Sequence, residues 1–359
     1  MRLVICGGGT AGHVYPALAL LDSWPGSPPD VTWIGTPDGM ERAIVGDAGL
    51  PFVGVRSGAV RGQRPDRLLR SGALLVVGLG QALRALRRLR AHVVLTTGGY
   101  VSVPVAAAAW LLRIPVVVFL PDIRPGVAVR AQRRLATRIA CAFDAAVEHV
   151  GADKAVVTGY PLRPALLTTD RATARRRFNV VGDEPVVVLY GGSRGARTLN
   201  HAVAAGLDDL LARCRLIHVC GVLDHDDMVA RRAQLPPDLQ ERYEVHAFLG
   251  DRLIDAFLAA DLCVARAGAS IMAELPAAGV PAIVVPGLFS DQRANAEWLA
   301  GHGAAVVIDD TAAPTALVPQ ICDLLADEPR RAAMARATQQ LARPEAAISL
   351  AKVLTEVAG

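Results

Sequence analysis

ARAGASIMAE, residues 265–274, is the stretch that decides the fold of this chain. The apolar run 262–265 predicts a short buried strand, Gly268 predicts a turn, and the residues after it have helical spacing. A second apolar run at 282–285 predicts the next strand, which completes a Rossmann-type βα unit. The free N–H groups and the positive dipole end at the start of such a helix suit a phosphate. Glu274 lies about one and a half turns into the helix, where it either binds a pair of sugar hydroxyls or is an ordinary surface carboxylate.

The same design occurs twice more. The apolar run 3–6 leads into GGGTAGH (7–13) and a predicted helix from about 14 to 21, and the run 185–190 leads into GGSRGA (191–196) and a predicted helix over 200–212. Alternating strands and helices favour parallel sheets, so we predict an α/β chain with two Rossmann-like halves. Further strands are predicted at 31–34, 52–55, 93–96, 116–120, 216–220 and 244–248.

The predicted division falls in the polar, Arg-rich segment 161–183, where the strands are interrupted. We expect an N-terminal domain over 1–162, a C-terminal domain over 163–343 and a last helix, 344–359, whose spacing is compatible with packing back on the first domain. Because ligands bind at the carboxyl ends of parallel strands, both Gly turns should face one cleft, which fits a reaction of two substrates.

Composition excludes several classes of protein. A formal charge of +4 is too small to indicate nucleic-acid binding, and neither Gly turn has the Lys-Ser/Thr end of a nucleoside triphosphatase loop. The six cysteines form no Cys-x-x-Cys pair, which is typical of free thiols in a reducing cytosol. No apolar run reaches the about 18 residues of a membrane span. No metal-ligand cluster has a useful spacing, and the acidic residues around His225 are interpreted as a solvated turn.

His13 and the segment Leu68–Arg90 carry further hypotheses. The positive end of a helix keeps an imidazole neutral, so His13 is a candidate general base, a donor to phosphate, or a capping or core histidine. In the segment, the apolar run 73–79 is followed by Arg84, Arg87 and Arg88. It is interpreted either as a buried helix with a basic end or as a surface helix that contacts an anionic bilayer.

Six motifs together resemble, in order, those of the MurG family, peripheral membrane transferases that add N-acetylglucosamine to lipid I in peptidoglycan synthesis. The motifs are GGGTAGHVYP (7–16), TGGYVSVP (97–104), TGYPLR (158–163), GGSRGARTLN (191–200), RAGASIMAE (266–274) and SDQRANA (290–296). The resemblance implies a GT-B fold and an inverting transfer from UDP-N-acetylglucosamine to a lipid-linked muramyl peptide, with no metal or cofactor in the protein. It also implies a cytoplasmic enzyme at the inner face of the cell membrane, with Leu68–Arg90 as its membrane contact.

The resemblance also implies the site residues. His13 would act near the diphosphate or the acceptor, as base or electrostatic helper, and Glu274 would bind the ribose hydroxyls. The other implied donor-binding residues are Arg163, Ser193, Arg266, Gln292 and Asn295. Loops that meet the diphosphate or the acceptor would include Thr10, Gly12, Gly99, Tyr100 and Gly192.

One segment departs from the family pattern. Where the family has a HEQN-type segment after a strand, this chain has FLPDIRPG (119–126), and Ser290 stands where the family has Asp. Asp122 is therefore a second candidate base, the alternative being an Asp that caps the turn. The change leaves open another lipid acceptor such as diacylglycerol, or a sugar-nucleotide-binding paralogue without catalysis. A UDP-sugar 2-epimerase would share the architecture, but its own motifs are not found.

Overall fold

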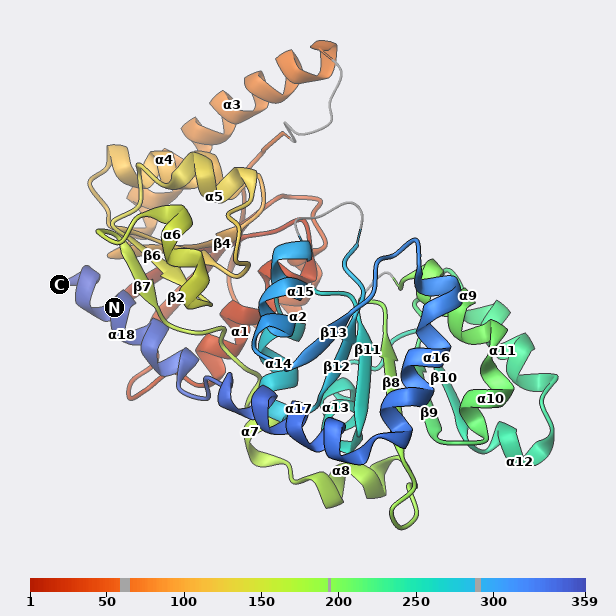
Figure 1. Ribbon diagram of the computed structural model, residues 1–359. Coiled ribbons are helices and arrows are strands. Elements are labelled where there is room, and N and C mark those ends of the chain that lie inside the picture. The colour runs from red at the N-terminus through yellow and green to blue at the C-terminus, as the bar shows by residue number, and fades with distance from the viewer. Residues whose placement is uncertain (59–64, 193–194, 288–291) are drawn as a thin grey trace. The chain divides into compact units, whose positions relative to one another are not determined.

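The computed structural model describes residues 1–58, 65–192, 195–287 and 292–359. Contacts within the chain define two compact units, Met1–Pro164 with Pro344–Gly359, and Ala165–Arg343. Each unit is a twisted parallel sheet covered by helices (Figure 1).

The first unit has a seven-stranded sheet in the order β3-β2-β1-β4-β5-β6-β7, and every strand pairing in its described part is parallel. Its central strands are Val- and Leu-rich and buried along their length, as strands covered on both faces must be. The strands are β1 (Arg2–Gly7), β2 (Asp30–Gly35), β3 (Phe52–Gly54), β4 (Val93–Gly98), β5 (Val116–Leu120), β6 (Arg138–Cys141) and β7 (Ala155–Val157). The helices are η1 (Ala11–His13), α1 (Tyr15–Asp22), α2 (Glu41–Asp47), α3 (Pro65–Leu89), α4 (Ser102–Leu111), α5 (Val127–Gln132), η2 (Asp144–Ala146) and α6 (Val147–Val150).

The second unit has a six-stranded parallel sheet in the order β10-β9-β8-β11-β12-β13. The strands are β8 (Val186–Tyr190), β9 (Arg215–Val219), β10 (Tyr243–His246), β11 (Leu262–Ala265), β12 (Ala282–Val284) and β13 (Ala305–Val307). The helices are α7 (Pro164–Thr168), α8 (Arg171–Arg177), α9 (Arg197–Ala205), α10 (Leu207–Leu211), α11 (His225–Ala233), α12 (Pro237–Gln240), α13 (Arg252–Ala259), α14 (Ile271–Ala278), α15 (Gln292–Gly301), α16 (Ala313–Ala326) and α17 (Glu328–Gln340).

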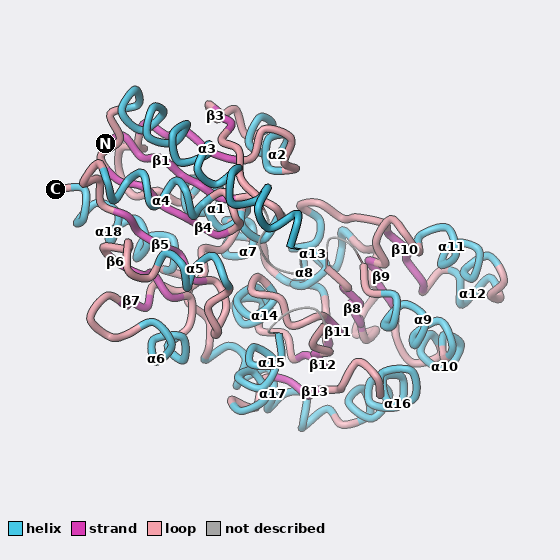
Figure 2. The backbone as a smooth tube through the Cα atoms, turned by 90° about the horizontal axis from the view of Figure 1, so that it is seen from above, coloured by secondary structure: helices cyan, strands magenta, loops and turns pink. Residues whose placement is uncertain are grey.

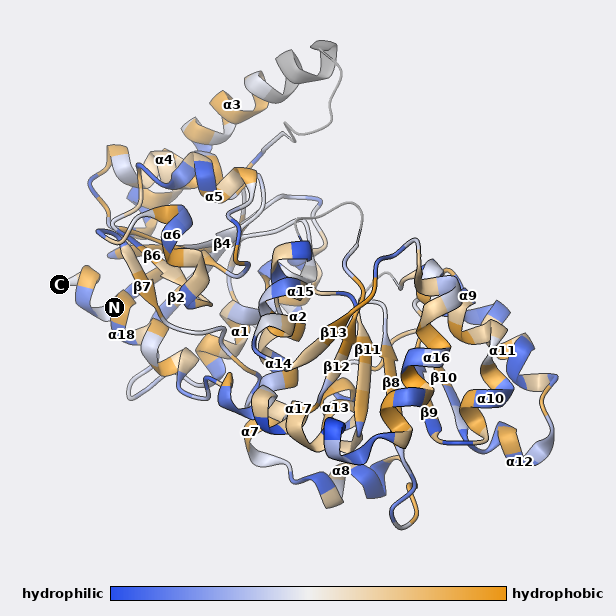
Figure 3. Ribbon diagram, in the orientation of Figure 1, coloured by the Kyte–Doolittle hydropathy of each residue, from blue (hydrophilic) through white to orange (hydrophobic). Residues whose placement is uncertain are grey.

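The last helix, α18 (Ala346–Ala358), belongs to the first unit, where it packs on α1, β4 and β6. It buries Leu350 and Leu354 in that contact. Figure 3 shows the hydrophobic strands of both sheets, each of which forms the centre of its own core.

The α/β fold with two parallel sheets was predicted correctly, but some elements were not. β6, β7 and β13 were missed because they are only three or four residues long and have no strict alternation. The helix predicted over 200–212 is in fact α9 and α10, divided at Gly206. A Cβ at position 206 would lie 2.8 Å from Val318 of α16, so the close packing of the two segments requires glycine there. Glycine in turn disfavours a continuous helix, which explains the division between α9 and α10.

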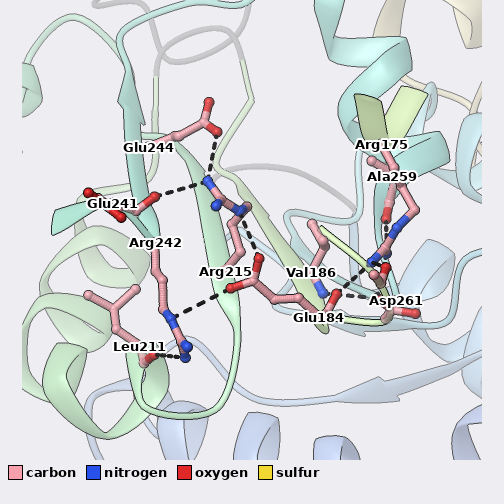
Figure 4. A network of polar contacts seen from close by, with 11 residues as sticks. Arg175, Glu184, Val186, Leu211, Arg215, Glu241, Arg242, Glu244, Ala259 and Asp261 are labelled. Carbon is pink, nitrogen blue, oxygen red and sulfur yellow. Dashed lines mark hydrogen bonds and ion pairs between the residues drawn. The ribbon is translucent and has the colours of Figure 1, made fainter. Parts of the chain in front are cut away.

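Charged side chains clamp the amino-terminal edge of the second sheet (Figure 4). Arg215 at the start of β9 contacts Glu184 at 3.1 Å and Glu244 at 3.4 Å, and Glu184 also contacts Arg242. Asp261, just before β11, accepts from Val186 N at 2.9 Å and pairs with Arg175. The ion pairs therefore lie at the strand starts, while the Gly turns follow the strand ends.

Candidate active site

A pocket of about 180 Å³ lies in the first unit, at the carboxyl ends of β4 and β5. It brings together four of the predicted residues, His13, Gly99, Tyr100 and Asp122. Leu120 and Val127 add apolar surface to its wall. Residues from three separate motifs thus meet at one place, because parallel strands place their carboxyl ends along the same edge.

The backbone around His13 fixes its ring. Nδ1 lies 2.8 Å from the carbonyl oxygen of Gly8 and 3.3 Å from Thr10 Oγ1. A carbonyl can only accept a hydrogen bond, so Nδ1 carries a proton, and in the neutral ring Nε2 then keeps the lone pair. The ring also packs against Gly98, where a Cβ would lie 2.7 Å from Nε2. His13 is therefore held in the tautomer that a general base requires.

The loop 97–100 is packed against the first Gly turn. A Cβ on Gly99 would lie 2.3 Å from Gly8 O, and Gly99 has a φ of +81°, so both space and conformation require glycine there. Below this loop, the fully buried Gln132 accepts from Thr96 Oγ1 at 2.8 Å and donates to Ser102 Oγ at 2.7 Å. Ser102 Oγ in turn donates to Gly99 O at 2.6 Å. This network ties α5 and the loop together as two walls of the pocket.

The remaining predicted residues of the first unit lie outside or at the rim of this pocket. Thr10 and Gly12 are exposed on the first Gly turn, and Thr10 reaches the His13 ring. Asp122, by contrast, lines the pocket and is half-buried just after β5. Arg163 is half-buried at the end of the first unit, so the structure does not bring it into the pocket.

In the second unit, two Gly-containing turns follow adjacent strands, β8 and β11. Gly192 has a φ of +89°, and a Cβ there would have no atom of the described residues beyond its chain neighbours within 4 Å, while Ser193 lies outside the described residues. Gly195 is packed so tightly that a Cβ would lie 2.1 Å from Cys220 O. Asn200 Nδ2 donates to the same carbonyl at 2.8 Å, which anchors the start of α9 to the end of β9.

The turn after β11 gathers three of the predicted donor residues. Glu274, 7 % exposed, lies in the first turn of α14. Asn295 is fully buried and its Nδ2 donates to Ala267 O at 3.0 Å. Arg266 Nη1 lies 2.5 Å from Asp310 Oδ1, at ion-pair distance but without hydrogen-bond geometry.

Gln292 lies at the start of α15, where its Oε1 accepts from Gly287 N at 2.9 Å. Arg266 also donates to the carbonyl of Val285, at 3.2 Å. Both side chains thus contact residues 285–287, which follow β12, next to the turn that holds Glu274.

Sequence reasoning missed Glu41, Gln132 and Asp310, which hold these turns from elsewhere in the chain. None of these three residues lies in a motif or stands out by periodicity. They are recognised only in the structure, where a charged or amide side chain is found buried. Asn200 ended a quoted motif without being chosen as a site residue. Over the described ranges, no group of three or more His, Cys, Asp or Glu is placed to hold a metal ion.

Two parallel α/β units with Gly turns after their central strands define the GT-B class of fold. The chain belongs to glycosyltransferase family 28, whose N-terminal domain matches residues 3–141 and whose C-terminal domain matches residues 186–350.

Relatives along the whole chain share one description, "UDP-N-acetylglucosamine--N-acetylmuramyl-(pentapeptide) pyrophosphoryl-undecaprenol N-acetylglucosamine transferase". The protein of Roseiflexus sp. (strain RS-1) is 38 % identical over 99 % of this chain and 94 % of its own length. That of Desulforudis audaxviator (strain MP104C) is 36 % identical over 100 % of this chain and 99 % of its own.

Solved structures agree with this assignment. MurG of Acinetobacter baumannii superposes with a TM-score of 0.78 at 27 % identity, covering 99 % of both chains. The UDP-GlcNAc 2-epimerase of Neisseria meningitidis has a TM-score of 0.71 at 12 % identity, covering 99 % of this chain and 100 % of that one, and so shares the fold alone.

Proposed function

We propose that this protein transfers N-acetylglucosamine from UDP-N-acetylglucosamine to N-acetylmuramyl-(pentapeptide) pyrophosphoryl-undecaprenol, the step from lipid I to lipid II. The observation that carries the proposal is the 38 % identity to a transferase of that description over 99 % of this chain. UDP-sugar is a substrate in this reaction, and no protein-bound cofactor takes part.

We assign the acceptor to the first unit. The attacking hydroxyl of the muramyl sugar forms a bond to the anomeric carbon of the donor, and the bond from that carbon to UDP breaks with inversion. His13 Nε2 is the proposed acceptor of the hydroxyl proton, supported by the Gly8 carbonyl that holds the proton on Nδ1. Asp122 lines the same pocket and is the alternative base.

The donor is assigned to the second unit. Glu274 is proposed to bind the ribose hydroxyls, and Gln292 to face the sugar. Asn295 and Arg266 are proposed to belong to the same donor site, where Asn295 donates to Ala267 O and Arg266 contacts Asp310 and Val285.

The leaving diphosphate needs positive charge, since the proposal includes no metal. We assign that task to the N-terminal ends of α9 and α14 and, as the family motifs imply, to Ser193 and Arg163. Backbone N–H groups at helix starts are pre-oriented, so they stabilise developing charge without reorganisation.

We further propose that α3 and α4 meet the inner face of the cytoplasmic membrane. The two helices lie side by side (Figures 1 and 2), and Val76 and Val77 of α3 are exposed, as are Trp110 and Leu111 of α4. Arg84, Arg87 and Arg88 follow on α3, also exposed, which suits anionic headgroups. Within the part of the chain that is described, no helix is long and apolar enough to cross a membrane. Because the curated relatives act on a lipid-linked acceptor, we propose a cytoplasmic location, peripheral on the membrane.

The test is a transfer assay with purified protein, radiolabelled UDP-N-acetylglucosamine and lipid I in detergent, in which labelled lipid II and UDP should form together. Parallel reactions with diacylglycerol as acceptor, and with UDP-glucose or UDP-galactose as donor, should give no product. Transfer to diacylglycerol but not to lipid I would replace the proposed acceptor. Binding of UDP-N-acetylglucosamine without transfer to either would mean that the protein is not catalytic.

A further inference from the structure

Glu41, the first residue of α2, is a carboxylate with no exposed surface. Its Oε1 accepts from Thr36 N at 2.8 Å and its Oε2 accepts from Gly9 N at 3.2 Å. Among the residues that the structure describes, no Arg, Lys or His forms an ion pair with it. A buried charge is costly unless it is hydrogen-bonded, so these two backbone N–H groups are what compensates the charge of Glu41.

Three glycines make room for this carboxylate. A Cβ on Gly8, Gly35 or Gly39 would lie between 2.2 and 2.9 Å from the Glu41 side chain. Burial, and secondly the nearby charge of Glu41, raise the pKa of the Cys6 thiol well above its usual value. The backbone around the Glu41 carboxyl therefore leaves no space for a side chain at Gly8, Gly35 or Gly39.

The Gly9 N–H and the Gly8 C=O belong to the same peptide group. That group donates to Glu41 through its nitrogen and accepts from His13 Nδ1 through its oxygen, at 2.8 Å. An anion at the N–H end polarises the peptide, and hydrogen bonds in a chain strengthen one another. The single peptide group between Gly8 and Gly9 therefore connects the Glu41 carboxylate with the His13 ring by two hydrogen bonds.

We propose that Glu41 is a positioning residue for His13, which acts through the Gly8–Gly9 peptide to hold the proton on Nδ1 and leave Nε2 free as a base. Its catalytic consequence rests on the function proposed above; its effect on the tautomer does not. Besides this peptide, the groups that face the ring are Thr10, Gly98 and, across the pocket, Tyr100 and Asp122. None of these replaces the carbonyl of Gly8 as the short acceptor at Nδ1.

Glu41→Gln tests the proposal because it keeps the side-chain volume. An amide has one acceptor oxygen and an NH₂ group, so one of the two backbone N–H groups loses its partner, and in either orientation the negative charge that polarises the Gly8–Gly9 peptide is removed. The matched control is Asp255→Asn in the second unit, a buried carboxylate that pairs with Arg177 at 2.6 Å. Both variants are checked by thermal melting, so that loss of fold is seen separately.

The decisive measurement is the ¹⁵N NMR spectrum of the imidazole nitrogens, which distinguishes a protonated nitrogen from one with a lone pair. His13 is assigned among the eight histidines by the signal that disappears in His13→Gln. The wild type should show Nδ1 protonated, Glu41→Gln should show a mixture of tautomers, and Asp255→Asn should match the wild type. With lipid I, Glu41→Gln should lower kcat about 10- to 100-fold with little change in the KM for UDP-N-acetylglucosamine, as for other partners that orient a functional histidine.

A wild-type spectrum with Nε2 protonated would overturn the proposal even if Glu41→Gln does not fold. Unchanged tautomer and unchanged kcat in a folded Glu41→Gln would overturn it as well. Absence of transfer by the wild type would instead refute the proposed function, while the NMR result would still decide the role of Glu41.

Discussion

Replacing His218 with Gln should change how the stability of the second unit depends on pH. His218 is fully buried in β9, where Nδ1 lies 2.8 Å from the Tyr243 hydroxyl and Nε2 lies 2.9 Å from Asn200 Oδ1. Burial, with a smaller contribution from His246, lowers the pKa of His218 from 6.5 to about 3. The folded protein therefore keeps this ring neutral at a pH where the unfolded chain protonates it.

The sign of the effect follows from proton binding. Between pH 6.5 and about 3 the unfolded state binds more protons than the folded state, so His218 reduces stability as the pH falls through this window. At about pH 4.5, two units below the unfolded pKa, the loss is about 3 kcal/mol, at about 1.4 kcal/mol per unit. His218→Gln removes hydrogen bonds, so the variant should be less stable than the wild type near pH 7.5. Its stability should not fall by this further amount at low pH, because glutamine does not titrate.

The assay is urea unfolding from pH 7.5 to pH 4.5, followed by tryptophan fluorescence, in which Trp298 reports the second unit and Trp24, Trp33 and Trp110 report the first. The difference in unfolding free energy between wild type and His218→Gln isolates this residue, because other groups titrate in both proteins. This difference in unfolding free energy should become smaller by about 3 kcal/mol as the pH falls from 7.5 to 4.5. His201→Gln, at an exposed histidine of the same unit, is the control and should show no such trend. A difference that stays constant with pH would refute the reasoning.

Three further predictions test the proposed site and membrane contact. Glu274→Ala should weaken binding of UDP-N-acetylglucosamine in calorimetry by about 1–3 kcal/mol, since it removes a buried charged acceptor; unchanged affinity would remove Glu274 from the donor site. His13→Ala should lower kcat with lipid I about 10²–10⁴-fold if His13 is the base, and near-wild-type turnover would transfer that role to another group. Changing Arg84, Arg87 and Arg88 together to Gln should reduce sedimentation with anionic vesicles, most of all at low salt; equal binding of the two forms would make the helix structural.

Much of the candidate site was visible in the sequence because its parts are local. The three Gly-containing segments predicted turns after strands, and the alternation of strands and helices implied that each turn lies at the carboxyl edge of its own sheet. His13, Tyr100 and Asp122 were each chosen from a different motif, and all three line one pocket of the first unit. The residues that hold the turns were not visible, because Glu41 and Gln132 contact them from about 30 positions away in the sequence.

The sequence by itself determined the α/β class, the two parallel sheets and the family, since periodicity, glycine turns and motif order are properties of short segments. Tertiary structure alone decided which polar groups meet. It placed the Gly8–Gly9 peptide between Glu41 and His13, buried His218 beside Asn200, and used Asn295 to hold Ala267. The physical reason is that a buried polar group must find its hydrogen-bond partner wherever packing brings one near, and packing joins residues that no local pattern connects.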